Sequence, residues 1–468
     1  MRRGICWFSA CVALAVPFLV FWRMTLFHFY VRGAFLQDSG QLAYLLWHSD
    51  MLLTQSASAG AGSYLAVHMV PLFWLISAVS WMLPASMAGF FALFLGASHA
   101  LLAFAVFWLL VSAYRTPPWI AALLGIAFAC SGLAFAIARY PHFETLIPAF
   151  FLLFATAQRL GHSKLAVSFF VLGLATREDA GLHYAILLLL VAAWSGWKGT
   201  AWRYAVVALV YVVVVAVLQR LCFPGTSAFE RIYLGNPPLA HLTPWSVGTR
   251  LLNMLLNRPY VLWPALGACV WAVRKRDPAV VLGYVACLPW LLLNTLAAGP
   301  MAGMLVSYYA FPFLIAMAWP LYVGAGWRGF AVLLALSFVP AQVPHNPGRL
   351  FLPASVLNGP SAETRDAIER AVSAIVAARP ELGVLVADNS VAALAPNGFS
   401  RREILFGDSS DETTPPDTVV FFIDGYDAQK LENAALPRHY AMPGTPIRLI
   451  SRLQLESVPA FAGLIAPE

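Results

Sequence analysis

Long apolar runs follow one another over the first 343 residues, and short polar segments separate them. About eleven of these runs reach or approach the roughly 20 apolar residues that a helix needs to cross a bilayer. They lie near residues 5–22, 87–112, 117–137, 143–157, 163–176, 182–195, 203–221, 259–273, 279–297, 303–323 and 328–343. The pattern predicts a mainly α fold, in which residues 1–343 form a polytopic transmembrane helical bundle.

The pattern changes toward the C-terminus. Prolines gather at the boundary, which indicates a Pro-rich linker over residues 344–359. Apolar residues then recur at helical spacing around Val372, and Leu382–Ala387 and Thr418–Ile423 are Val-rich runs typical of strands. This alternation predicts a small C-terminal α/β domain over residues 360–468.

Composition supports a membrane protein. The chain is 60% hydrophobic and only 11% charged, with a mean hydropathy of +0.73. These values exclude an ordinary soluble globular protein. The aromatic content of 14% suits belts of aromatic side chains at the membrane interfaces.

The net charge of +7 is explained by membrane topology rather than by a nucleic-acid partner. The basic residues lie in alternate short loops, and these loops all fall on one side if the N-terminus is cytoplasmic. We therefore expect no nucleic acid among the partners. The residues that define this side are Arg2, Arg3, Arg115, Arg159, Lys164, Lys198, Arg203, Arg274, Lys275, Arg276 and Arg328.

The same topology places residues 23–86 in a long outward loop and the C-terminal domain outside the cell membrane. It requires that the apolar run Leu65–Leu83 lie along the interface, or dip in and return, without crossing. If this run crosses, every later basic loop changes side, and that alternative stays open.

A charged cluster, Thr176-Arg177-Glu178-Asp179, interrupts the apolar sequence. Ionisable side chains near membrane depth are costly unless they line a wet cavity or pair with one another, so the cluster is a candidate functional site. His183 follows Asp179 by four residues, which places both on one helical face. The alternative is a buried ion pair that pins two helices.

The long outward loop contains polar residues with helical spacing. Asp38, Gln41 and His48 share one side if the segment is helical, although Asp38 is also a favoured residue for capping a helix. His68 precedes the apolar run of the loop and is a second candidate, with a purely structural role as the alternative.

Two further outward turns carry candidate residues. Arg139, His142 and Glu144 lie between two apolar runs, and His142 and Glu144 are expected to face the same outward cavity as Asp38. The alternative for Glu144 is a simple interaction with a helix N-terminus. Tyr308 and Tyr309 open a later apolar run, where they belong to an interfacial belt or line a lipid or sugar site.

The sequence predicts no cofactor. The acidic and histidine residues of the outward turns leave a divalent metal open, but no close-spaced ligand motif such as His-Glu-x-x-His supports one. No phosphate-binding glycine loop, nucleophile elbow or Cys-x-x-Cys pair occurs either.

Several short motifs, in order, resemble landmarks of an uncharacterised prokaryotic family of predicted polytopic membrane proteins, a domain-of-unknown-function family. In the transmembrane part they are Leu36-Gln37-Asp38-Ser39-Gly40-Gln41, His68-x-x-Pro71, Thr176-Arg177-Glu178-Asp179 and Ser307-Tyr308-Tyr309. In the C-terminal part they are Ala387-Asp388-Asn389, Arg401-Arg402-Glu403-Ile404 and Val419–Asp424. The likeness covers nearly the whole chain, with one departure: Gln37 stands where the family has Phe.

That family in turn resembles the GT-C class of membrane glycosyltransferases. The resemblance implies a GT-C-like helical core in a bacterial inner membrane and inverting transfer of a sugar from a polyprenyl-phosphate donor to an acceptor on the outer face. It implies catalytic roles for four acidic residues, with Asp38 as the general base: Asp38, Glu144, Glu178 and Asp179. The implied substrate-binding residues are Gln41, His68, Arg139, His142, Arg177, His183, Tyr308 and Tyr309.

Within these roles, the resemblance implies that Arg177, or Arg139 near it, holds the lipid phosphate. Membrane lipids and the lipid-linked sugar are the expected partners. Two other functions stay open: a transporter or flippase for a lipid-linked or small polar substrate, and a non-catalytic membrane scaffold or sensor. Against transport, the sequence contains no evident inverted repeat.

Overall fold

A computed structural model describes the chain except for several short segments. The described residues are 2–31, 36–48, 63–83, 86–138, 140, 142–224, 233–303, 305, 307–338, 354–377, 384–398, 404–405, 418–423, 438–451 and 453–467. The protein is mainly helical, as the sequence predicts, and forms two compact units. Unit 1 comprises residues 1–19, 65–72 and 96–352, and unit 2 comprises residues 20–64, 73–95 and 353–468.

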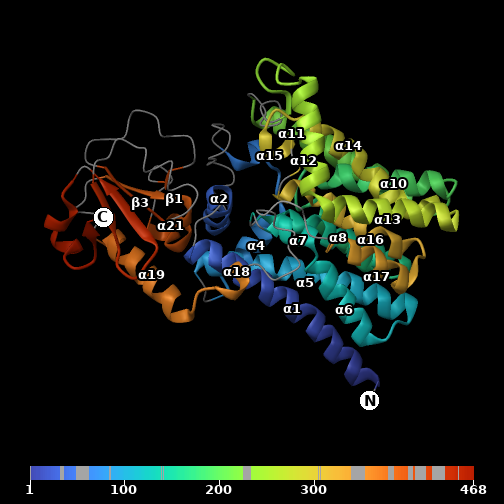
Figure 1. Cartoon of the computed structure of the whole chain (residues 1–468), viewed down its shortest axis with the longest axis horizontal. Coiled ribbons are helices and arrows are strands. Elements are labelled where there is room, and N and C mark those ends of the chain that lie inside the picture. Colours follow the sequence, from blue (N-terminus) through green and yellow to red (C-terminus); the bar gives the residue numbers. More distant parts are fainter. Residues whose placement is uncertain are drawn as a thin grey trace. The chain divides into compact units, whose positions relative to one another are not determined.

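Unit 1 is built from helices packed in sequential and crossed pairs (Figure 1). Its larger helices are α6 (Pro118–Ala129), α7 (Gly132–Ala138), α8 (Leu146–Arg159), α9 (Ser163–Leu174), α10 (Ala180–Trp194), α11 (Ala201–Cys222), α12 (Pro244–Asn257), α13 (Pro259–Lys275), α14 (Leu282–Leu296), α16 (Pro312–Tyr322) and α17 (Gly326–Leu336). Its short helices are η1 (Tyr64–Ala66), η2 (Phe143–Thr145), η4 (Pro278–Val281), α15 (Pro300–Gly303) and η5 (Ser307–Ala310). The long helix α5 (Met87–Tyr114) is divided between the two units.

Glycines allow some of these helices to approach closely. A Cβ atom at Gly181 on α10 would lie 2.8 Å from the carbonyl oxygen of Ala208 on α11. A Cβ atom at Gly283 on α14 would lie 2.8 Å from the Cα atom of Ala316 on α16. Both distances are too short for a side chain, so glycine at these positions sets the spacing of the two helix pairs.

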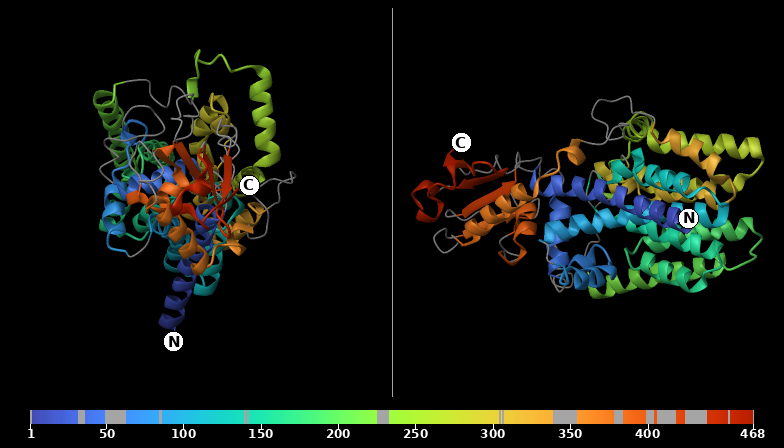
Figure 2. Two further views of the ribbon diagram at one scale, coloured as in Figure 1. Left: turned by 90° about the vertical axis from the view of Figure 1, so that its left-hand side faces the viewer. Right: turned by 90° about the horizontal axis from the view of Figure 1, so that it is seen from below.

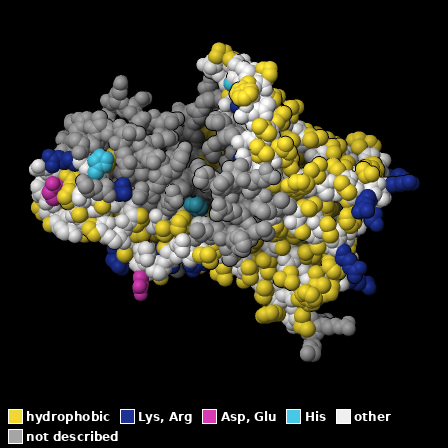
Figure 3. Space-filling model, viewed as in Figure 1, with side chains coloured by type: hydrophobic (Ala, Val, Ile, Leu, Met, Phe, Trp, Pro, Cys, Tyr) yellow, Lys and Arg dark blue, Asp and Glu magenta, His cyan; other side chains and the backbone are white. Residues whose placement is uncertain are grey.

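Arg159 and the charged cluster lie at opposite ends of α8. At one end, Arg159 closes α8, donates to the carbonyl oxygens of Leu321 and Tyr322 at the end of α16, and lies 5.0 Å over the Tyr114 ring. At the other end, α8 begins beside Glu144 and α10 begins after Asp179. Figure 3 shows a largely hydrophobic surface on this face of the helices, with Lys and Arg gathered at one edge.

Four helices are long and apolar enough to cross a membrane, counted over the described residues only. They include α5, α11 and the segments Gly4–Tyr30 and Pro278–Leu296, and the bent pair α6 and α7 raises the number to five. Each predicted apolar run contains a helix, but several, such as α9 with 12 residues, are about 18 Å long and fall short of the hydrocarbon thickness. The structure thus supports a membrane protein at this coarser level.

The helix α12 is absent from the sequence prediction, in which residues 222–258 fall between two apolar runs. Its start is well defined: the Thr243 hydroxyl accepts from the Ser246 amide, the Ser246 hydroxyl accepts from the Thr243 amide, and Pro244 takes the first helical position. Together these features form a capping box, a local signal that the sequence carries.

Unit 2 combines helices with a mixed sheet (Figures 1 and 2). Its strands are β1 (Val384–Asp388), β2 (Ile404–Leu405), β3 (Thr418–Ile423), β4 (Arg438–Ala441), β5 (Ile447–Ser451) and β6 (Ala466–Pro467), in the spatial order β2-β1-β3-β5-β4-β6. β1 pairs parallel with β2 and β3, and the remaining pairs are antiparallel. β1 and β3 lie where the sequence predicts strands.

The helices of unit 2 include the C-terminal half of the first helix. They are α1 (Arg2–Tyr30, shared with unit 1), α2 (Leu36–Trp47), α4 (Leu72–Ser80), α18 (Ala354–Leu357), α19 (Ala362–Ala377), α21 (Asn389–Leu394), η6 (Pro396–Gly398), η8 (Leu455–Ser457) and η9 (Pro459–Phe461). α2 packs against α21, which also contacts β1 and β3.

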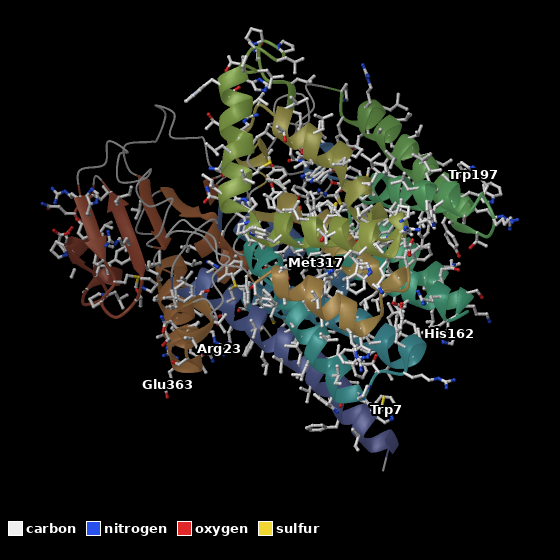
Figure 4. All side chains as sticks on the ribbon, turned by 45° about the vertical axis from the view of Figure 1, so that its right-hand side comes forward. Trp7, Arg23, His162, Trp197, Met317 and Glu363 are labelled. Atoms are coloured by element: carbon white, nitrogen blue, oxygen red, sulfur yellow. The ribbon has the colours of Figure 1, made fainter. Side chains whose placement is uncertain are left out.

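The end of α1 is tied to the start of the C-terminal region. Arg23 donates from Nε to the Val356 carbonyl oxygen at 2.9 Å and from Nη2 to the Gly359 carbonyl oxygen at 3.4 Å (Figure 4). About two helical turns further along α1, the Tyr30 hydroxyl donates to Glu369 Oε1 at 2.5 Å. The two bonds of Arg23 satisfy carbonyl groups at and just after the end of the short helix α18, and the bond of Tyr30 reaches a side chain of α19.

The run Leu65–Leu83 contains only short helices. α4 has nine residues, which corresponds to about 14 Å, less than half of the hydrocarbon thickness. Trp74, Leu75 and Val79 on this helix are exposed. That the run does not cross the bilayer stays a prediction.

Candidate functional site

The turn that joins α9 to α10 is the centre of the candidate site. The Thr176 hydroxyl donates to the Leu172 carbonyl oxygen at 3.0 Å, and the Leu72 amide donates to the Ala175 carbonyl oxygen at 2.9 Å. Asp179 is the N-cap residue of α10, but its carboxylate makes no capping bond to the helix. The backbone therefore fixes the turn, while the acidic side chains point to other partners.

Arg177 binds two of these partners. Its Nε donates to Asp179 Oδ1 at 2.7 Å and its Nη2 to Asp179 Oδ2, which makes a two-point ion pair. Its Nη1 donates to Glu144 Oε1, which comes from η2 at the start of α8. The Arg177 guanidinium also lies 5.4 Å from the centre of the Phe311 ring. Arg177 thus joins two turns that are distant in sequence.

This buried ion network is nearly closed to solvent. Glu144 is 0% exposed and Arg177 is 4% exposed. The second oxygen of Glu144 binds His142 Nδ1. All three guanidinium nitrogens of Arg177 are engaged, which is the arrangement expected of a buried ion pair that pins two helices.

Ion pairing opposes the effect of burial in the turn between α9 and α10. Burial alone would raise the pKa of the Asp179 carboxyl, but the Arg177 guanidinium more than reverses this effect and leaves that pKa lower than usual. The pKa of Arg177 is raised because Asp179 and Glu144 outweigh the effect of burial on the guanidinium.

A second interaction in the same turn is partly open to solvent. Glu178 Oε1 lies 2.7 Å from His68 Nδ1, and Glu178 Oε2 accepts a hydrogen bond of 2.8 Å from the Met69 amide. The His68 and Glu178 side chains are 28% and 23% exposed. This pair is therefore close to the buried network in sequence, but its side chains are more exposed to solvent than those of Arg177 and Glu144.

Aromatic rings flank the cluster. The His142 ring is stacked on Tyr308 with ring centres 4.6 Å apart, and Tyr308 is stacked on Tyr309 at 4.4 Å. His183 meets the edges or faces of Trp290 and Phe311 at 4.9 and 5.0 Å. Stacked rings beside hydrogen-bonding carboxylates suit the recognition of an amphipathic, hydroxyl-bearing ligand.

The structure brings most of the predicted site residues together. The ones that meet in unit 1 are His68, His142, Glu144, Arg177, Glu178, Asp179, His183, Tyr308 and Tyr309. Arg139 lies outside the described residues, and so do the side chains of Asp38 and Gln41, whose backbone belongs to α2 in unit 2. Their predicted roles stay predictions.

Sequence reasoning missed several members of the site. The Met69 amide and the rings of Trp290 and Phe311 complete it, although Trp290 and Phe311 sit in apolar runs with no local mark of function. Over the described part of the chain, no group of three or more His, Cys, Asp or Glu residues is arranged to hold a metal ion. A metal requirement stays untested.

Comparison with known proteins adds no family assignment. No protein-family model matches the sequence, and no curated protein matches it either.

Proposed function

We propose that this protein is a GT-C-type membrane glycosyltransferase that moves a sugar from a polyprenyl-phosphate donor to an acceptor at the outer face of a bacterial inner membrane. The observation that carries the proposal is the position of the acidic and aromatic cluster. It lies at the ends of α8, α10 and α16 that are opposite to the basic turns. The positive-inside rule assigns those basic turns to the cytoplasm, so the cluster faces outward.

In this proposal the eleven apolar runs all cross the membrane, with the short helices completed by the turns around them. The contacts of α1 support an outward C-terminal region. Arg23 and Tyr30 lie toward the end of Gly4–Tyr30 that is far from the N-terminus, and they bind residues 356–369. If this helix crosses with the N-terminus in the cytoplasm, those residues are expected outside.

The cluster residues take different roles. The Arg177 network of Glu144 and Asp179 acts as a rigid frame, since its charges are already paired and Arg177 and Glu144 are buried. The stacked rings of Tyr308 and Tyr309 offer faces on which a sugar can pack. Asp38 keeps the predicted role of general base, which such a carboxylate supports with about 10²–10⁴-fold in rate.

The test of the proposal has two parts. A strain that lacks the gene should accumulate a polyprenyl-phosphate sugar or lose a sugar from an envelope glycan, as read by mass spectrometry of lipid and glycan extracts. Complementation with Asp38→Asn should then fail at normal protein abundance, because Asn can still cap a helix but cannot take the proton. Unchanged lipids and glycans in the deletion strain would refute glycosyl transfer.

Asp277 provides a matched control for Asp38→Asn. Its Oδ1 accepts a hydrogen bond from the Ala279 amide at 3.1 Å, so it is an aspartate that caps a helix at the basic end of the bundle. Asp277→Asn should complement fully. If Asp38→Asn complements as well as this control does, Asp38 has no part in the reaction.

A second candidate is a non-catalytic scaffold. It is favoured by one observation, the complete pairing of Arg177 with Glu144 and Asp179 in a buried site. It predicts that variants of the solvent-accessible residues Glu178 and His68 have no effect on any glycan or lipid pool.

A further inference from the structure

The helix α12 carries an apolar face that points away from the rest of unit 1. Met254 is buried, whereas five apolar side chains of this helix are between 40% and 84% exposed. At about 100° per residue the five span an arc of about 140°, and Met254 lies on the other side of the helix. They are Trp245, Leu251, Leu252, Leu255 and Leu256, here called the α12 apolar arc. A contiguous exposed apolar surface of this kind marks an interaction site.

Hydrogen bonds on the opposite side keep the arc from turning inward. Arg250 Nη1 donates to the carbonyl oxygen of Thr295, in the last turn of α14, at 2.9 Å. A Cβ atom at Gly303 would lie 2.6 Å from Arg250 Cζ, so glycine leaves the room that the guanidinium occupies. At the end of α12, Arg258 Nε donates to the Leu305 carbonyl oxygen at 3.3 Å. A rotation that buried the arc would break these bonds.

The direction of α12 differs from that of its neighbours. It runs across α13 and α14, and it is the lime-green helix of Figure 2 (Figures 1 and 2). The chain bends at Arg258, whose backbone is not helical and which Pro259 follows. The turn of α14 that α12 binds is the one far from the basic residues 274–276. If α13 and α14 cross a membrane, α12 therefore lies along its surface on the side of the cluster.

The arc itself favours lipid as its partner. It contains no charged residue, and Trp245 at its start suits a membrane interface. Exposed apolar positions continue along the chain into α13, where Trp263 is 47% and Leu266 is 55% exposed. Lipid covers a crossing helix and the helix next to its end alike, whereas a second copy of this chain covers only the patch where two copies meet. The continuity therefore indicates a lipid surface.

We propose that α12 is an interfacial helix that binds the membrane surface on the cluster side, with the α12 apolar arc below the lipid head groups. An amphipathic helix in this position buries its apolar face by about 5–10 Å. Through Arg250 and Arg258 the lipid-bound helix holds residues 295–305, which lead directly into Tyr308 and Tyr309. This role does not depend on glycosyl transfer and applies equally to a scaffold.

Spin labels on the arc test the contact. Leu252→Cys and Leu255→Cys are made in the full-length protein without native cysteines, labelled with a nitroxide, and reconstituted in nanodiscs of phosphatidylcholine and phosphatidylglycerol. Collisions with oxygen, which concentrates in hydrocarbon, are compared with collisions with a water-soluble nickel chelate. We expect oxygen to exceed nickel at both positions. The arc positions are exposed, so the labels replace no packed side chain.

Two matched controls give the reference values. Leu292→Cys lies on α14 within the candidate span Pro278–Leu296 and is 60% exposed, so it represents lipid. Arg370→Cys is exposed on α19 and represents water. The ratio of oxygen to nickel collisions at the arc should match Leu292→Cys and exceed Arg370→Cys. A ratio equal to that of Arg370→Cys would place the arc in water and overturn the proposal.

Two other results would also overturn it. Protection from both reagents that is lost in discs holding a single protein copy would mean that a second copy covers the arc. Protection from both reagents in single-copy discs would mean that another segment of the same chain covers it.

Trp245 gives a second measurement that leaves the native cysteines in place. The emission lost in Trp245→Phe is that of Trp245, which is 84% exposed. We expect lipids brominated on their acyl chains to quench this emission in nanodiscs. Emission from Trp245 that brominated lipids leave unchanged would contradict insertion of the arc.

Discussion

The buried network around Arg177 should dominate the stability of unit 1. Arg177→Met removes the cation that binds both Glu144, which is 0% exposed, and Asp179. Two carboxylates then stay in a buried site with only histidines beside them. Removing one partner of a buried ion pair costs about 3–5 kcal/mol, and we expect Arg177→Met to reach at least that range.

Glu144→Gln should be milder. The amide oxygen of glutamine can still accept from Arg177 Nη1, and Arg177 keeps both bonds to Asp179. The loss of a single charge-assisted hydrogen bond is worth about 1.5–3 kcal/mol. The double variant should cost less than the sum of the two single variants, with a coupling of about 0.5–3 kcal/mol, because it leaves fewer unpaired charges than Arg177→Met alone.

The assay is unfolding of the purified protein in detergent, followed by tryptophan fluorescence, together with protein abundance in membranes. Arg328→Met is the matched control, since Arg328 is exposed and lies over the ring of its neighbour Trp327. A surface change of this kind is expected to stay within about 0.5 kcal/mol. If Arg177→Met is as stable as Arg328→Met, or if the two single effects simply add, the network does not hold the turns together.

Three other results are expected. Stability should fall as the pH is lowered from about 5, because the pKa of Asp179 is lower in the folded protein than in the unfolded chain, so protonation breaks its ion pair with Arg177. The fall should be smaller in Asp179→Asn, and a flat pH profile from pH 6 to 3 would contradict this. Alkaline phosphatase fused to the C-terminus should be active and a fused cytoplasmic fluorescent reporter dark, and the reverse pattern would invert the topology. Single cysteines at Gly62 and Ala85, in a background without native cysteines, should both react with an impermeant reagent from outside; reaction of only one would mean that Leu65–Leu83 crosses.

Much of the helical part could be predicted because its signal is local. Apolar runs give helices wherever they occur, and the strand Thr418–Ile423 follows from its β-branched and aromatic residues. Lengths were harder to predict, since the ends of α9 and α10 depend on the turn that Arg177 stabilises by a contact with Glu144, 33 residues away. Hydropathy contains no information on such a contact.

The candidate site was predicted as a set of residues but not as an arrangement. Charge in apolar sequence marked Arg177, Glu178 and Asp179, and the interrupted runs marked His142 and Glu144. Their division into a buried network and a solvent-accessible pair depends on burial, which adjacent residues such as Arg177 and Glu178 do not share. The same limit applies to Asp38, whose predicted role rests on sequence resemblance alone.

The bonds from α1 to the C-terminal region have a consequence for the order in which the protein can be assembled. Arg23 and its acceptor Val356 are 333 residues apart, and translation at 5–20 residues per second needs roughly 17–67 s to cover that distance. During this time α1 has left the ribosome, but its final partners do not yet exist. Until the last quarter of the chain emerges, water and lipid head groups must accept the hydrogen bonds of the Arg23 guanidinium. A chain that stops before residue 354 therefore lacks the partners of Arg23 and Tyr30 on the first helix it made.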